Sequence, residues 1–76
     1  MRLSELKPGK KATITQIQET GPARKRLLDM GLVKGSKLQI ICSAPLGDPI
    51  EIEVRDYKLT LRKREAENII VMEENT

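Results

Sequence analysis

The stretch PARKRLLDMGL, residues 22–32, predicts a short helix that carries its own stop signal. Proline is well tolerated at the first helical position, because the N–H that it lacks would be unpaired there. Ala23, Leu27 and Met30 recur at helical spacing. With Leu28 beside them, these side chains predict one apolar face.

Gly31 suits the left-handed residue that follows many helices, and Leu32 can then pack back on Leu27. Such a helix is too short to be stable alone. Because the flanking segments are typical of β structure, we expect the helix to serve as a lid or contact surface on a small β fold.

Arg24, Lys25 and Arg26 lie off the apolar face and must contact either water or a partner. The first 37 residues carry nine Lys and Arg against three acids, which makes this half of the chain electropositive. The three cations are therefore a candidate partner-binding site, with a merely solvated helix face as the open alternative. If they bind a partner, replacing all three by Glu is expected to abolish binding and leave the fold intact.

Five segments are typical of β strands: residues 11–18, 38–44, 50–55, 58–62 and 69–72. Ile17 interrupts the alternation of the first segment, which predicts a bulge or a strand end. Cys42 shares the apolar face of the second, which predicts a buried structural cysteine. Five short strands in so short a chain favour a mainly β fold, a small five-stranded barrel forming one domain over residues 1–76.

The third and fourth segments predict a hairpin. A tight turn at Asp56-Tyr57 would pair Val54 with Leu59, Ile52 with Leu61, and Glu51 with Arg62. Both apolar pairs then lie on one face and the opposite charges meet on the other. Two-residue turns of the primed types favour glycine, which this turn lacks.

Several classes of function are disfavoured by composition. The chain has no histidine, the usual general base and commonest transition-metal ligand, and one cysteine. It has no phosphate-binding glycine loop. We therefore expect no enzyme, no cofactor, no small-molecule substrate and no high-affinity iron site. One cysteine and no apolar run of about 18 residues favour a cytoplasmic protein that reaches a membrane only through a partner.

Nucleic-acid binding is the alternative from a different class. The runs Arg24–Arg26 and Arg62–Arg64 could contact phosphates. Proteins that bind single strands usually stack bases on aromatic side chains, however, and Tyr57 is the single aromatic residue. The sequence thus disfavours nucleic acid as a partner but leaves it as an alternative.

Four motifs in order resemble the FeoA family, small cytosolic proteins of bacterial ferrous-iron uptake. They are Leu3-x-x-Leu6-x-x-Gly9, Arg26-Leu27-Leu28-Asp29-Met30-Gly31-Leu32-x-x-Gly35, Ala44-Pro45-Leu46-Gly47-Asp48-Pro49-Ile50 and Leu61-Arg62-x-x-Glu65-Ala66-x-x-Ile69-x-Val71. The resemblance implies an SH3-like five-stranded barrel with a short helical insertion. Asp56 departs from the family, which often has glycine at that turn, and this puts the turn type in question.

The resemblance also implies a partner: FeoB, the membrane Fe(II) transporter that carries a cytoplasmic GTPase domain. On this basis we expect a cytosolic accessory or regulatory protein of ferrous-iron uptake. A related barrel forms the C-terminal domain of the DtxR-type iron-dependent repressors. An iron-regulatory module therefore remains an alternative, together with nucleic-acid binding.

The second candidate binding site is the loop formed by Pro45, Leu46, Gly47, Asp48 and Pro49. Two prolines limit its freedom, and an ordered loop loses less entropy when it binds. Leu46 has two possible positions. Exposed at the tip, it could anchor a contact; folded back, it would plug the barrel.

Overall fold

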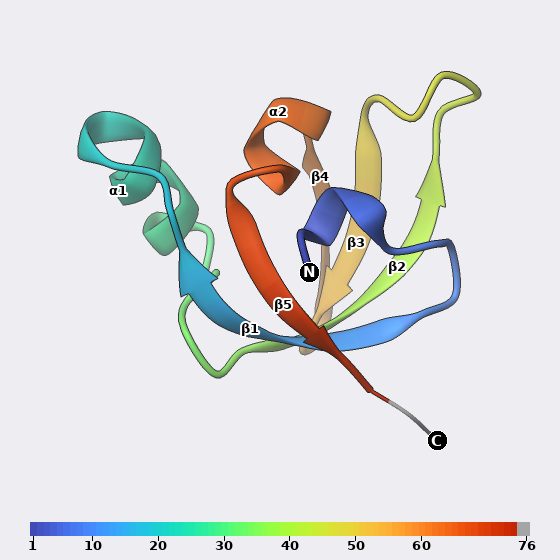
Figure 1. Ribbon diagram of the computed structural model, residues 1–76, viewed down its shortest axis with the longest axis horizontal. Coiled ribbons are helices and arrows are strands. Elements are labelled where there is room, and N and C mark those ends of the chain that lie inside the picture. The colour runs from blue at the N-terminus through green and yellow to red at the C-terminus, as the bar shows by residue number, and fades with distance from the viewer. Residues whose placement is uncertain (75–76) are drawn as a thin grey trace.

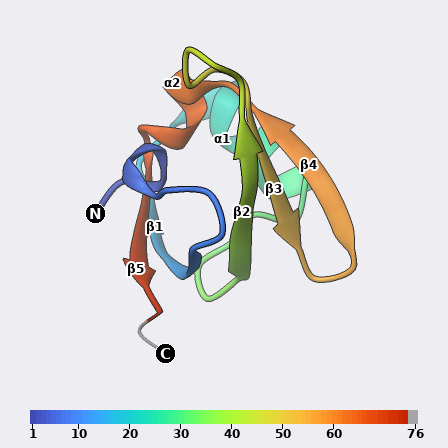
Figure 2. The same cartoon turned by 90° about the vertical axis from the view of Figure 1, so that its right-hand side faces the viewer.

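The computed structural model describes residues 1–74 as five antiparallel strands in one curled sheet, in the order β4-β3-β2-β1-β5 (Figures 1 and 2). The helices α1 and α2 lie with the β2–β3 loop at one end of the sheet. In chain order the elements are η1 (Leu3–Glu5), β1 (Lys11–Ile17), α1 (Gly21–Asp29), β2 (Lys37–Ser43), β3 (Ile50–Val54), β4 (Tyr57–Leu61), α2 (Lys63–Ala66) and β5 (Ile69–Glu73).

The core is aliphatic because nearly every residue available to fill it is Leu, Ile or Val. Alternate residues of the strands face inward, as in β3, where Ile50, Ile52 and Val54 are buried and the two glutamates between them are half-buried. Other fully buried side chains come from η1, α1, the turn after α1, β4 and β5: Leu3, Leu27, Leu32, Leu61, Ile69 and Val71. The predicted mainly β fold with five strands and a short helical insertion is confirmed.

The end of α1 follows the predicted stop. Gly31 has φ +86°, its N–H donates to the Leu28 carbonyl at 2.9 Å, and the Leu32 N–H donates to the Leu27 carbonyl at 3.1 Å. The apolar face is narrower than predicted, because Ala23 and Leu28 are exposed. One buried side chain, Leu27, thus attaches the helix to the core, with Met30 packed at its margin.

The predicted hairpin register is wrong by two residues. Val54 pairs with Tyr57 and Ile52 with Leu59, so the turn is Arg55-Asp56 rather than Asp56-Tyr57. Glu51 consequently lies opposite Thr60, not Arg62. The turn has positive φ at Arg55, 55°, the first of its two residues, which is typical of type II′.

The prediction that Cys42 is buried is also wrong. The pairing of β2 with β3 shifts between Ile40 and Cys42, so that Cys42 pairs with Glu51 while Ile40 pairs with Ile52. A bulge of this kind inserts one residue and turns the following side chains to the other face. Cys42 is therefore exposed. The irregularity predicted in β1 is present, between Ile14 and Gln16.

Across residues 1–74, no helix is long and apolar enough for a membrane crossing.

Candidate docking surface

Leu46 stands at the tip of the β2–β3 loop with 91% of its surface exposed. This observation decides between the two predicted positions of the side chain, since Leu46 does not plug the barrel. The loop holds its shape by short-range backbone bonds. The Gly47 N–H donates to the Ala44 carbonyl at 2.7 Å, and the Ala44 N–H donates to the Pro49 carbonyl at 3.1 Å.

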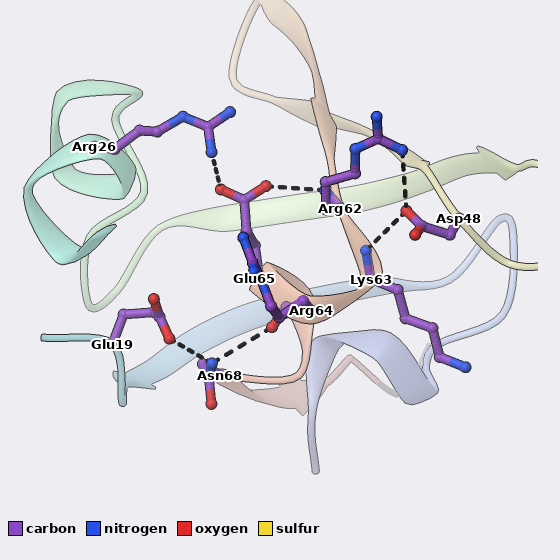
Figure 3. Close-up of polar contacts among 8 residues, drawn as sticks. All are labelled: Glu19, Arg26, Asp48, Arg62, Lys63, Arg64, Glu65 and Asn68. Atoms are coloured by element: carbon purple, nitrogen blue, oxygen red, sulfur yellow. Dashed lines mark hydrogen bonds and ion pairs between the residues drawn. The ribbon is translucent and has the colours of Figure 1, made fainter. Parts of the chain in front are cut away.

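The base of the loop is attached to the start of α2. The Lys63 backbone N–H donates to Oδ1 of Asp48 at 3.1 Å, and Nη1 of Arg62 lies 3.8 Å from the same oxygen (Figure 3). Leu46 therefore projects from a loop that is held both by its own backbone hydrogen bonds and by contacts with α2.

Cations surround this base. Arg62, Lys63 and Arg64 are all exposed, and a shallow depression of about 340 Å³ is lined by Asp48, Arg62 and Arg64. We call Pro45–Pro49 together with Arg62 and Arg64 the loop surface. An exposed apolar side chain beside exposed guanidinium groups is a composition typical of protein–protein contacts.

Glu65 links α2 to α1. Its side chain is only 9% exposed, Oε1 accepts the Arg62 N–H at 3.0 Å, and Oε2 pairs with the Arg26 guanidinium (Figure 3). This role was not predicted, although Arg62 and Glu65 have the spacing of a capping box, in which a glutamate follows three residues after the residue that precedes the helix. That spacing could have identified Glu65 as a structural residue.

The three predicted cations of α1 differ in their surroundings. Lys25 Nζ lies 3.2 Å from Asp29 Oδ2, and Arg24 Nη1 donates to the Ile17 carbonyl at 3.0 Å. Arg26 neutralises the nearly buried Glu65. The expectation that all three can be replaced without disturbing the fold is therefore corrected for Arg26, because its reversal would set two carboxylates against each other.

Tyr57 has a structural role that the sequence does not predict, since the sequence only places it in the hairpin turn and offers it as a base-stacking candidate. Its hydroxyl donates to the Met30 carbonyl at 2.6 Å, which holds the end of α1 against the start of β4. Within the described part of the chain, no three acidic or cysteine side chains are grouped to hold a metal ion.

A family model described as the FeoA domain matches residues 1–73. The Fe(2+) transport protein A/Fe(2+) transporter FeoB fusion protein of Porphyromonas gingivalis is 42% identical over 71 residues, which are 93% of this chain and only 8% of that protein. A relative from Campylobacter jejuni is 35% identical over 71 residues, which cover 93% of this chain and 96% of that one.

Among solved structures, the FeoA protein of Chlorobium tepidum is 49% identical with a TM-score of 0.87, covering 93% of this chain and 68% of that one. The zinc-complexed FeoA of Stenotrophomonas maltophilia, named a prokaryotic SH3 domain protein, is 29% identical with a TM-score of 0.82, covering 95% and 89%. A manganese-dependent transcriptional repressor has a TM-score of 0.89 at 17% identity, covering 97% of this chain and 36% of that one, a likeness of fold alone. The predicted SH3-like fold is confirmed.

Proposed function

The chain belongs to the FeoA family of Fe(2+) transport, and on that premise we propose that it is a cytosolic accessory protein that binds a FeoB-type membrane transporter. The observation that carries the proposal is the Porphyromonas gingivalis fusion, in which a region 42% identical to this chain shares one polypeptide with FeoB. A covalent link holds two domains at high effective concentration, which is useful when they contact each other. We propose that the domain of this chain makes the corresponding contact.

The loop surface is the proposed binding site. Leu46 would enter an apolar pocket on the partner, while Arg62 and Arg64 would face acidic side chains around that pocket. Anchored loops lose little conformational entropy on binding, and one well-buried apolar anchor can supply much of the affinity. The chain itself would need no catalytic group for this role. We propose that it acts in the cytoplasm, where the GTPase domain of the transporter lies.

The experiment is calorimetric titration of the chain with the cytoplasmic GTPase domain of the FeoB-type transporter from the same organism. Leu46→Asp is expected to weaken binding by at least about tenfold, since a charge would have to enter an apolar pocket. Met72→Asp is the matched control, because Met72 is another exposed apolar side chain, 65% exposed, on β5. Equal affinity of the two variants would exclude the loop surface as the binding site. An absence of binding by the wild-type chain would contradict the proposed function.

The same protein preparations distinguish the nucleic-acid alternative. Binding of a single-stranded oligonucleotide through phosphates would fall steeply with salt and would tolerate Leu46→Asp. Such a result, without binding of the GTPase domain, would favour the alternative.

A further inference from the structure

We infer that the groove between α1 and β1 is a second docking surface, which takes an acidic chain segment carrying an apolar side chain. The groove has a volume of about 390 Å³ and is lined by Thr15, Gln16, Ile17, Arg24, Leu28 and Lys34. The inference does not depend on which protein binds the loop surface. At the end of the sheet that carries both helices, α1 and the β2–β3 loop lie at opposite edges with α2 between them (Figure 1).

The charge of the groove has one sign. Both ionisable side chains in its lining, Arg24 and Lys34, are cations, and no acid lines it. The acids near the ends of α1 are engaged elsewhere: Asp29 pairs with Lys25 at 3.2 Å, and Glu19 accepts a hydrogen bond from Asn68. A carboxylate entering the groove would therefore meet two cations and no like charge from its lining.

Arg24 is already oriented for this role. Its Nη1 donates to the Ile17 carbonyl at 3.0 Å, which fixes the guanidinium at the edge of the groove. A guanidinium has five N–H donors in a planar fork that fits a carboxylate. Since one bond positions the group, donors remain for a ligand at a reduced cost in side-chain entropy.

The apolar part of the lining indicates what accompanies the carboxylates. Leu28 of α1 is 38% exposed in this lining, and Ile17 is half-buried against the core. Val33, also 38% exposed, lies in the turn that precedes Lys34. The lining contains no aromatic side chain on which a base could stack. Apolar side chains that share a groove with two cations fit an acidic peptide with a leucine-type residue better than a nucleic acid.

The test uses a fluorescein-labelled peptide in which two leucines are flanked on each side by pairs of glutamates. Its anisotropy is expected to show saturable binding to the full chain. The pair of changes Arg24→Gln and Lys34→Gln should weaken this binding by at least about tenfold at low salt. Leu28→Ser should weaken it as well, and a peptide with serines in place of the leucines should bind the wild type less tightly.

The control removes the same charge elsewhere. The pair Lys7→Gln and Lys58→Gln takes two exposed cations from outside the groove, so its net charge equals that of the groove pair. Equal losses for the two pairs would show non-specific attraction and overturn the inference, as would an absence of saturable binding. Peptide-induced amide shifts should fall on residues 15–17 and on Leu28.

A further variant separates this surface from the loop surface. Leu46→Asp should leave peptide affinity unchanged, whatever it does to binding of the GTPase domain. Loss of peptide binding in Leu46→Asp, or amide shifts confined to residues 45–49, would overturn the inference and assign the peptide to the loop.

Discussion

Gly31 satisfies two separate constraints at a single residue. Its φ of +86° is one that side-chain-bearing residues rarely adopt, and a Cβ there would lie 2.1 Å from the Tyr57 hydroxyl oxygen. The hydroxyl cannot withdraw freely, because it donates to the Met30 carbonyl. Gly31 therefore ends α1 and also permits the contact that holds α1 against β4.

We predict that Gly31→Ala lowers the free energy of unfolding by about 2–3 kcal/mol, from backbone strain plus loss of the Tyr57 hydrogen bond. Gly35→Ala is the control, because Gly35 also has positive φ, +91°, but no atom within 4 Å of its Cβ position. It should cost about 1 kcal/mol. Denaturation by urea measures both. Equal costs would show that the Tyr57 contact is unimportant. The double variant Gly31→Ala/Tyr57→Phe should lose less stability than the sum of the losses in the two single variants.

Cys42 illustrates how a bulge changes the chemistry of one residue. Because the side chain is turned outward, its thiol donates to Oε1 of Glu51 at 3.4 Å. This hydrogen bond, reinforced by the negative charge of Glu51, raises the pKa of Cys42 above the ordinary thiol value, and Lys58 opposes the shift.

We predict that Cys42 is alkylated slowly for an exposed thiol, since only the thiolate reacts and a raised pKa leaves less of it at neutral pH. Glu51→Gln should lower the midpoint of the rate–pH profile and speed the reaction at neutral pH. Lys58→Gln should move the midpoint the opposite way. Iodoacetamide kinetics across the alkaline range measure the three profiles. If Glu51→Gln leaves the midpoint unchanged, Glu51 is not the cause of the raised pKa of Cys42.

At the scale of the element, α1 is attached by few contacts. Leu27 is its single buried side chain, and polar bonds do the rest: Arg24 to the end of β1, Arg26 to α2, and Tyr57 to the carbonyl that follows the helix. So short a helix depends on these contacts, because its own backbone bonds do not stabilise it in water.

We predict that Arg26→Gln destabilises the protein by about 1–3 kcal/mol, because it leaves the nearly buried Glu65 carboxylate without its charged partner. Lys25→Gln removes the same charge from the same helix, but its ion pair with Asp29 is exposed. That change should cost less than about 0.5 kcal/mol. Urea midpoints compare the two variants, and similar midpoints would show that the pair with Glu65 contributes nothing.

The elements themselves could be predicted from the sequence, but their register could not. Periodicity locates β3 and β4, yet registers that differ by two residues bury the same side chains, so the hydrophobic pattern cannot choose between them. The choice rests on the turn, where Arg55 takes the positive φ. The bulge in β2 was not predicted for a related reason. A single extra residue at Ile41 shifts the pairing but leaves the composition of the strand unchanged.

At the scale of the whole molecule, the candidate site was only half predictable. The loop and its residues follow from sequence, but the position of Leu46 depends on contacts between Asp48 and Lys63, which lie 15 residues apart. The groove between α1 and β1 likewise exists only after tertiary packing brings Arg24 and Lys34 together. Local patterns identify the side chains, and the barrel decides which of them are available to a partner.

Fe(II) is the ion of the transport process in which the family takes part. Acids of the described part of the chain are spread over the molecule, and four of them face cations: Asp29, Asp48, Glu65 and Glu73. No three of the described acids are grouped, an ion at any of these four would have to displace a cation, and the chain offers no imidazole. We therefore predict that Fe(II) binds the isolated chain more weakly than about micromolar. Anaerobic calorimetry measures this, with a competing chelator titrated as the positive control. A stoichiometric site tighter than micromolar at low protein concentration would contradict the prediction; one that forms only at high concentration would instead indicate ligands shared between copies.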